Sequence, residues 1–212
     1  MVKHPGISYT PAMPDFTFER CAAHPVAGID EAGRGPWAGP VVAAAVILGE
    51  TDLAADMLAL LDDSKKLTAK RRDMLFDQIT GTALVGVGMA DVTEIDELNI
   101  LNATYLAMQR ATANLPVAPA FALVDGNRLP ELPCPAQAIV KGDSKCFSIA
   151  AASVVAKVFR DRLMGELAET YPGYGWARNA GYGTAQHHAA IIKHGITPHH
   201  RRSFKPIAAI IT

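Results

Sequence analysis

The chain has 212 residues, 50% of them hydrophobic and 19% charged, so it can bury a large core and is neither a disordered tail nor a disulfide-stapled miniprotein. Its 20 Lys and Arg against 21 Asp and Glu leave a formal net charge of -1, which taken alone argues mildly against nucleic-acid binding. Three cysteines without a C-x-x-C pair suggest neither a disulfide framework nor a cysteine zinc site, and they fit a reducing cytoplasm. The longest apolar stretch, residues 41–48, is too short to span a bilayer, so we expect a cytoplasmic protein without a membrane anchor.

The chain is predicted to begin with an arm and two strands. Residues 1–25 hold interspersed prolines without apolar periodicity, which predicts an irregular N-terminal arm. Apolar runs at 26–30 and 41–48, separated by glycines, predict two neighbouring strands joined by a glycine-rich turn. Thr68 is a suitable N-cap for a helix over 69–79, where apolar residues recur at helical spacing.

Strands and helices continue to alternate through the middle of the chain. Residues 82–90 are strand-like, and the spacing of Thr93 and Asp96 resembles a capping box that opens a long helical region. One face of that helix is predicted to be apolar and to contain Leu98, Leu101, Tyr105 and Met108. Short apolar runs at 121–124 and 138–140 predict two further strands.

Helices dominate the last third of the sequence. The alanine-rich segment after residue 144 predicts a long helix to about Thr170, and residues 184–194 predict another helix before a basic tail at 199–202. The alternation of strands and helices along the chain places it in the α/β class with a central sheet.

Acidic residues recur where the predicted strands end. Asp30 and Glu31 end the first strand, and Asp125 and Asp143 follow the two later ones. Ligands of open α/β sheets bind beyond the carboxyl ends of the strands, so these carboxylates can converge on one site. Converging carboxylates repel one another unless a cation lies between them, and hard divalent ions prefer such oxygen ligands. Ordinary Asp-Gly turns and a solvated strand edge remain an alternative, because spacing alone does not separate the two readings.

A glycine loop follows the first acidic pair directly. Gly33, Arg34 and Gly35 combine close backbone approach with a planar fork of donors suited to a phosphate or a sugar edge. The loop matches neither the Walker pattern nor G-x-G-x-x-G. A tight hairpin turn without a ligand is the alternative at this point.

Five motifs follow one another in the order and spacing of bacterial ribonuclease HII, which the chain resembles over residues 26–206. These motifs are Asp30-Glu-Ala-Gly-Arg-Gly-Pro36, Asp63-Ser-Lys-Lys-Leu67, Val124-Asp-Gly-Asn127, Lys141-Gly-Asp-Ser144 with Ala151-Ala-Ser153 and Ala156-Lys157, and Gly181-Tyr-Gly-Thr184. The resemblance implies an RNase H-like fold with a mixed five-stranded sheet flanked by helices and a helical C-terminal extension. It also implies cleavage of the RNA strand of RNA–DNA hybrids, including a single ribonucleotide embedded in duplex DNA, with Mg²⁺ or Mn²⁺. The related type 3 enzymes lack the Gly-Arg-Gly signature and carry a further N-terminal domain, so type 3 is disfavoured.

The resemblance also assigns roles to individual positions. The metal-binding acids fall on Asp30, Glu31, Asp125 and Asp143. The segment that senses the 2′-hydroxyl falls on Gly33, Arg34 and Gly35, and the tyrosine that packs on the next deoxyribose falls on Tyr182. Contacts to the nucleic-acid backbone are expected from Lys65, Lys66, Lys141 and Ser144.

The same resemblance divides the chain into three parts. Residues 1–25 form the arm, 26–170 the RNase H-like catalytic domain, and 171–212 a helical substrate-binding extension. Two metal ions about 4 Å apart would clamp the scissile phosphate, with Asp30 bridging both, and the cut would leave 3′-hydroxyl and 5′-phosphate ends on the 5′ side of the ribonucleotide. We expect a monomer that binds RNA–DNA hybrids and DNA containing ribonucleotides; no motif identifies a replication-clamp contact.

Two other functions fit parts of the sequence. A nucleotide-handling phosphotransferase would use the glycine loop for a triphosphate, but the Lys-Ser/Thr pair that follows such a loop is missing. A hybrid-binding module would carry a degraded site, whereas the acid set is complete.

Several polar and aromatic residues are expected to stay outside the chemistry. Asp161 on the long helix is more typical of a surface ion pair than of a metal ligand. No Cys or carboxylate completes a zinc-spaced ligand set with the histidines at 187, 188, 194, 199 and 200. Trp37 and Trp176 lie in glycine loops, where packing is the usual role.

The near-neutral total conceals an uneven distribution of charge. Residues 141–212 hold ten Lys and Arg and four Asp and Glu, a net of +6, whereas residues 1–140 hold ten and 17, a net of -7. The acidic part contains three of the expected metal acids, and the basic part suits phosphate backbones. The overall charge therefore does not count against a nucleic-acid substrate.

Overall fold

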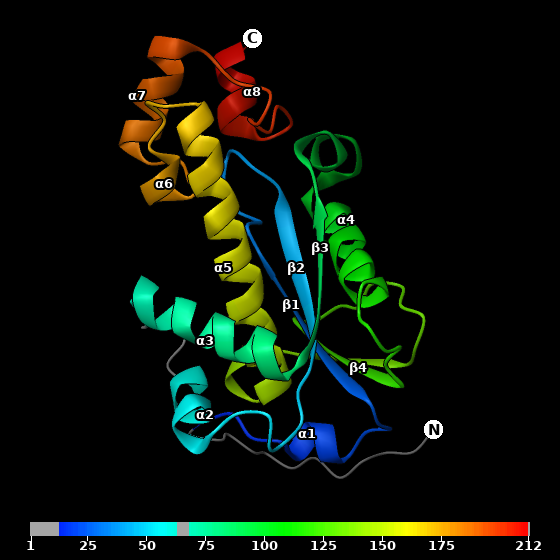
Figure 1. The fold of residues 1–212 in the computed structure, drawn as a ribbon. Coiled ribbons are helices and arrows are strands. Elements are labelled where there is room, and N and C mark those ends of the chain that lie inside the picture. Colours follow the sequence, from blue (N-terminus) through cyan, green and yellow to red (C-terminus); the bar gives the residue numbers. More distant parts are fainter. Residues whose placement is uncertain (1–12, 63–67, 212) are drawn as a thin grey trace.

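The computed structural model describes residues 13–62 and 68–211, which contain a five-stranded sheet in the order β3-β2-β1-β4-β5 (Figure 1). The strands are β1 Val26–Ala32, β2 Val41–Ile47, β3 Leu84–Ala90, β4 Phe121–Asp125 and β5 Ala136–Ile139. β1 pairs antiparallel with β2 and parallel with β4, β2 pairs antiparallel with β3, and β4 pairs parallel with β5. The expected mixed five-stranded α/β sheet is confirmed.

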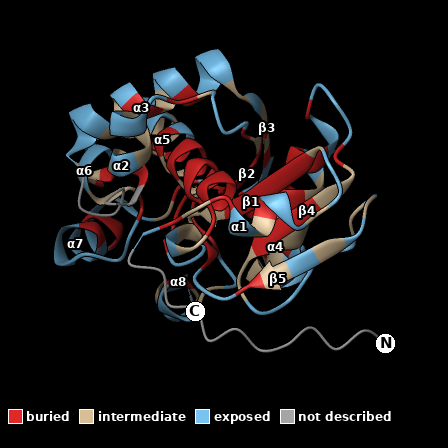
Figure 2. Cartoon of the chain, turned by 90° about the horizontal axis from the view of Figure 1, so that it is seen from below, coloured by how far each residue is buried: buried red, intermediate tan, exposed pale blue. Residues whose placement is uncertain are grey.

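Helices cover both faces of the sheet. On one face α5 (Phe147–Thr170) packs with α2 (Ala55–Asp62) and α3 (Ala69–Thr82), and on the other face α4 (Val92–Ala113) packs alone (Figure 1). Figure 2 shows buried residues concentrated on α5 and β1, whereas α3 is largely exposed. α5 approaches β1 closely because Gly28 has no side chain: a Cβ there would lie 2.2 Å from the carbonyl carbon of Ser148.

The start of α4 differs from the sequence prediction. The N-cap is Asp91, whose carboxylate accepts from Glu94 N at 2.9 Å while the Glu94 carboxylate accepts from Asp91 N at 2.9 Å. This reciprocal pair is the capping box of α4. The capping box predicted at Thr93 and Asp96 is therefore wrong, because it was placed two residues too late in the sequence. The Asp96 carboxylate instead accepts from the backbone N–H groups of residues 202 and 203.

The predicted apolar face of α4 is also wrong in part. Asn99 interrupts the helix with φ 67° and ψ 163°, so the helical spacing does not run unbroken through this residue. Leu98 is exposed, although Met108 is buried as predicted. The buried face consists mainly of the small residues Ala103, Ala107 and Ala111, together with Ile95 and Met108.

The N-terminal arm is more ordered than predicted where the structure describes it. It contains a short helix, α1 (Thr17–Arg20), and the buried Glu19 carboxylate accepts from both N and Oγ of Ser148, at 2.9 and 2.7 Å. Glu19 thereby supplies an acceptor for the first turn of α5, whose own N-cap residue makes no side-chain cap bond. Asp15 also exchanges backbone hydrogen bonds with residues 145 and 147. The arm thus supports the segment between Asp143 and α5.

The chain beyond α5 folds into three helices, α6 (Trp176–Asn179), α7 (Ala185–His194) and α8 (Lys205–Ile211). They lie around the C-terminal end of α5 (Figure 1) and share with it and with the β1–β2 loop an apolar cluster that includes Met164, Ala38 and Trp176. The predicted helices ending near Thr170 and spanning 184–194 are confirmed, as is the N-cap Thr68; Thr184 is the N-cap of α7. Among the described residues, no helix combines the length and apolarity needed to cross a membrane.

Candidate active site

Three parallel strands bring the four acids to one edge of the sheet. Asp30 and Glu31 lie near the end of β1, and Asp125 ends β4. Ile29 pairs with Val124, so Asp30 and Asp125 occupy the next position on their two strands. β5 ends one turn before Asp143, which lies in the 3₁₀ helix Gly142–Ser144. The carboxyl ends of β1, β4 and β5 therefore meet at the predicted location.

The electrostatics of Asp30 show that the acids face one another. Asp30 is 6% exposed, and burial together with repulsion from Glu31, Asp125 and Asp143 raises its pKa well above the usual range. Its carboxylate accepts from the backbone N of Glu31 at 2.7 Å. Burial also raises the pKa of Glu31, and Arg34 partly offsets that rise through its charge and a 3.2 Å ion pair. A cation between these carboxylates would relieve the repulsion.

The turn after β5 is shaped around Asp125. Its Oδ1 accepts from the backbone N of Gly142 at 2.6 Å, and a Cβ at Gly142 would lie 2.5 Å from the Ile149 side chain. Lys141 before it adopts the left-handed conformation, with φ 56° and ψ 47°. Lys141 and Ser144 are exposed beside the acids, but the Ser144 hydroxyl donates to the Lys141 carbonyl at 2.9 Å and closes the turn locally.

The acids suit a divalent ion that takes some of its ligands from the protein and the rest from water or substrate. Within residues 13–62 and 68–211, no three His, Cys, Asp or Glu side chains are close enough to enclose one ion by themselves. A metal at this edge would therefore need further oxygens from water or phosphate, and Mg²⁺ commonly keeps waters and binds through one or two carboxylates. The mutual repulsion on Asp30 and this open arrangement fit such an ion.

Two buried arginines hold the glycine loop. Arg201 is 0% exposed and donates to the carbonyls of Gly33, Arg34 and Gly39 at 2.6, 2.9 and 2.9 Å. Burial, with repulsion from Arg160, lowers the pKa of Arg201 to about 9, which still leaves it cationic at neutral pH.

Arg160 holds the continuation of the same loop. It is 1% exposed and donates to the carbonyls of Pro40, Ala180 and Ala38 at 2.9, 2.9 and 3.1 Å. Gly33 has φ +96°, and a Cβ there would lie 2.0 Å from Arg160 Nε, so the loop requires glycine at this position.

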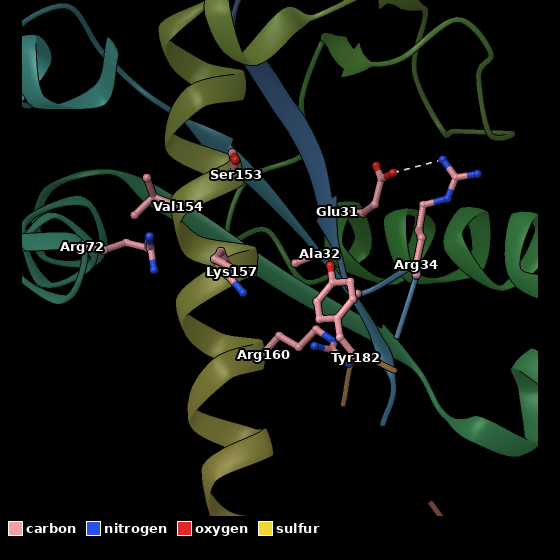
Figure 3. A pocket seen from close by; sticks show the side chains of 11 residues that line it. Glu31, Ala32, Arg34, Arg72, Ser153, Val154, Lys157, Arg160 and Tyr182 are labelled. Carbon is pink, nitrogen blue, oxygen red and sulfur yellow. Dashed lines mark hydrogen bonds and ion pairs between the residues drawn. The ribbon is translucent and has the colours of Figure 1, made fainter. Parts of the chain in front are cut away.

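Tyr182 stands across a cavity from the acids. Its side chain is 47% exposed, and its Cε1 would lie 3.4 Å from a Cβ at Gly35, so the ring packs against the glycine loop. A cavity of about 390 Å³ is lined by Glu31, the glycine loop, Tyr182 and cationic groups from two helices. Figure 3 shows Arg72 of α3 and Lys157 of α5 extending toward this cavity.

Some predicted site residues are not brought together by the structure, and others were missed. Lys65 and Lys66 lie outside the described residues, so their predicted phosphate contacts stay predictions. Asp161 pairs with Lys157 Nζ at 2.8 Å, as expected for an ion pair on the helix surface. Arg72, Arg160 and Arg201 were not predicted from the sequence as site residues, because isolated arginines on helices and tails are usually solvated.

Comparison with known proteins identifies the family. The sequence model of the family described as Ribonuclease HII matches residues 27–207. The chain belongs to the ribonuclease HII family. Ribonuclease HII of Rhodospirillum rubrum is 57% identical over 197 residues, which cover 92% of this chain and 90% of that protein. In the structure of the PCNA:RNase HII complex from Archaeoglobus fulgidus, a chain with 28% identity matches with a TM-score of 0.73, covering 88% of this chain and 97% of that one. Bst-RNase HIII, solved in complex with Mn²⁺, matches with a TM-score of 0.70 at 20% identity. The match covers 88% of this chain and 68% of that one and shows a shared fold.

Membership of the ribonuclease HII family establishes the general activity. The chain is a divalent-metal-dependent ribonuclease H, a hydrolase that acts on RNA–DNA hybrids. The phosphotransferase alternative is thereby wrong. The hybrid-binding alternative is also disfavoured, since the acid set is complete at the edge of the sheet.

Proposed function

We propose that this member of the ribonuclease HII family, besides cutting the RNA strand of hybrids, cuts on the 5′ side of single ribonucleotides in duplex DNA and leaves 3′-hydroxyl and 5′-phosphate ends. The packing of Tyr182 against Gly35, beside Glu31 in one cavity, carries this proposal. The 2′-hydroxyl distinguishes RNA from DNA at a given sugar. The glycine loop would contact the 2′-hydroxyl of the ribose, and the Tyr182 ring would pack on the next sugar, which has no 2′-hydroxyl. Together the two contacts would select an RNA–DNA junction.

The acids would hold the metal ions of the reaction. Asp30, Glu31, Asp125 and Asp143 are the ligands we assign to two Mg²⁺ or Mn²⁺ ions. When bound, such ions activate a water and stabilise the leaving 3′-oxygen of the phosphodiester. Asp30 is repelled by all three other acids, so it would hold the ions together with them.

The chain's own residues position the substrate around these acids. Arg34 pairs with Glu31 and restrains its carboxylate. The backbone of residues 33–35 would approach the ribose, because glycines leave it unshielded. Lys157 and Arg72 would contact phosphates on the far side of the cavity. We assign the same role to Lys65, Lys66, Lys141 and Ser144, and we assign residues 171–212 to holding the duplex.

The proposal is tested with three end-labelled duplexes of the same sequence: all DNA, DNA with one ribonucleotide, and a continuous RNA–DNA hybrid. With Mg²⁺ or Mn²⁺ we expect the second to be cut once, immediately 5′ of the ribonucleotide, and the first to stay intact. Religation of the product by DNA ligase would verify the 3′-hydroxyl and 5′-phosphate ends. An intact second duplex under conditions that degrade the hybrid would overturn the proposal while leaving the family's general activity in place.

A further inference from the structure

Two buried histidines of the C-terminal helices touch each other and the backbone of Tyr182. His187 on α7 is 0% exposed and His200 in the following segment is 1% exposed. Their Nε2 atoms lie 3.1 Å apart, and His187 Nδ1 lies 3.0 Å from the Tyr182 carbonyl oxygen. Trp176 Nε1 donates to His187 Nε2 at 3.1 Å. The pair is therefore connected at one end to Tyr182.

The partners fix where the protons of this pair lie. A carbonyl oxygen only accepts, so His187 Nδ1 carries a hydrogen and its Nε2 is the acceptor for Trp176. His200 Nδ1 accepts from the backbone N of Thr197 at 2.9 Å, so His200 carries its hydrogen on Nε2 and directs it at His187 Nε2, whose single lone pair is shared between this donor and Trp176. Both rings are neutral in this arrangement, and burial lowers the pKa of each, that of His200 to about 4.

The backbone of Tyr182 is held on both sides of the residue. Gly181 O accepts from Trp37 N at 2.8 Å, which ties the turn to the loop that carries Gly35. Tyr182 N donates to Asn179 O at 2.8 Å, and Tyr182 O accepts from Thr184 N at 2.8 Å within the turn as well as from His187 Nδ1 at 3.0 Å. Gly181 suits its φ of +82°, but Ala180 before it has φ +46°, which a residue with a side chain rarely adopts. The position of the Tyr182 ring over Gly35 therefore depends on these hydrogen bonds, of which those to Trp37 and His187 come from outside the turn.

We propose that the His187–His200 pair determines specificity by positioning: it fixes the Tyr182 carbonyl and so sets the distance between the ring that meets the deoxyribose and the loop that meets the ribose. This inference rests on the proposed function, because it concerns the role given there to Tyr182. His187 and His200 act through Tyr182 and do not contact the reacting atoms. Loosening the pair should reduce the preference for a junction over a continuous hybrid.

A pair of matched substitutions separates this role from simple packing. In His187→Asn the side-chain amide nitrogen takes the place of Nδ1 and can still donate to the Tyr182 carbonyl. In His187→Gln the amide nitrogen takes the place of Nε2 and is too far along the side chain to donate to that carbonyl. The readout is the ratio of kcat/KM on the single-ribonucleotide duplex to that on the continuous hybrid. We expect His187→Gln to lower this ratio about tenfold, the effect of losing one hydrogen bond, and His187→Asn to retain it within about threefold. His24→Gln, at an exposed histidine outside the segment assigned to the duplex, is the control and should leave the ratio unchanged.

A double variant tests whether the pair acts through the tyrosine. In a Tyr182→Ala background, His187→Gln should change the ratio no further. Equal losses on both substrates, or additive losses in the double variant, would overturn the inference. If Tyr182→Ala itself leaves the ratio of the wild-type protein unchanged, the role proposed for Tyr182 fails; if Tyr182→Ala lowers the ratio and His187→Gln does not, only the inference fails.

The hydrogen-bond arrangement can be measured in the unmodified chain, independently of activity and of variant folding. Imidazole ¹⁵N chemical shifts assigned to the pair at pH 7 should show His187 with its proton on Nδ1 and His200 with its proton on Nε2, both neutral. An imidazolium at either position, or the reverse tautomers, would also overturn the inference.

Discussion

Replacing Arg201 by lysine tests whether the glycine loop is held by a buried guanidinium. Lysine keeps the positive charge but presents a single nitrogen in place of a planar fork of donors. The three carbonyls that Arg201 contacts belong to Gly33, Arg34 and Gly39. One ammonium group cannot follow the fork geometry, so we expect at least two of these carbonyls to lose a charge-assisted hydrogen bond.

The cost follows from the number of bonds and from their burial. A hydrogen bond to a charged group contributes about 1.5–3 kcal/mol, so losing two lowers the free energy of unfolding by ~3 kcal/mol or more. Small proteins have about 5–15 kcal/mol of stability, so the Arg201→Lys chain should still fold. The loop that carries Gly33 would be looser in the folded protein, and we expect kcat/KM on a single-ribonucleotide duplex to fall about tenfold or more.

Urea unfolding and cleavage kinetics measure the two effects separately. The control is Arg202→Lys, the neighbouring exposed arginine, which should shift stability by no more than about 0.5 kcal/mol. If Arg201→Lys unfolds at the wild-type urea midpoint and cleaves at the wild-type rate, the loop does not depend on these three bonds and the reasoning is refuted.

Three further predictions concern the acids, the phosphate contacts and pH. Asp30→Asn should lower metal-dependent cleavage about 100-fold or more, with Asp161→Asn unchanged, because loss of a metal ligand costs at least as much as loss of a group that supports one. Lys157→Gln should make the slope of log affinity for a hybrid against log salt less steep by about 1, measured by fluorescence anisotropy. The pKa of His200 is about 4 in the fold against 6.5 as its ordinary value, so the unfolded chain binds more protons between those pH values. Stability should therefore fall as the pH drops from 6.5 toward 4, by up to ~1.4 kcal/mol per pH unit more than in His200→Gln.

Each of these predictions has a result that contradicts it. Wild-type turnover in Asp30→Asn would show that the acids are wrongly assigned. An unchanged salt slope in Lys157→Gln would mean that this lysine stays paired with Asp161 in the complex. Parallel stability profiles of the wild type and His200→Gln would show that His200 titrates normally.

The positions of the acids were predictable because they follow from local rules. Apolar runs fix the strands, and a polar residue directly after a buried strand lies at the edge of the sheet whatever the rest of the chain does. Thr68 was predictable as an N-cap for the same reason, since a cap depends on the next three residues. The capping-box rule also applies at the start of α4, but it was applied to the wrong residue. The sequence holds two overlapping patterns, Asp91 with Glu94 and Thr93 with Asp96, and the one that ends in Glu forms the reciprocal pair.

The groups that hold the loops in place were not predictable because their partners are distant in sequence. Arg201 bonds to carbonyls more than 160 residues away, and nothing near it in the sequence indicates burial. His187 and His200 were considered as possible metal ligands and set aside, and their mutual contact depends on how α7 packs against the following segment. Backbone carbonyls, which every sequence contains, are invisible as partners in a sequence pattern.

These buried cations change what the charge distribution means. Of the ten basic residues in 141–212, Arg160 and Arg201 are buried and donate to backbone carbonyls, while Arg162 pairs with Asp73 outside this segment. The net of +6 in this third of the chain therefore overstates the charge offered to a phosphate backbone. Part of the basic excess stabilises loop geometry, where it has no salt-dependent contact with substrate. Each phosphate contact contributes about -0.9 to the slope of log affinity against log salt. The slope for hybrid binding should accordingly be less steep than ten such contacts would give.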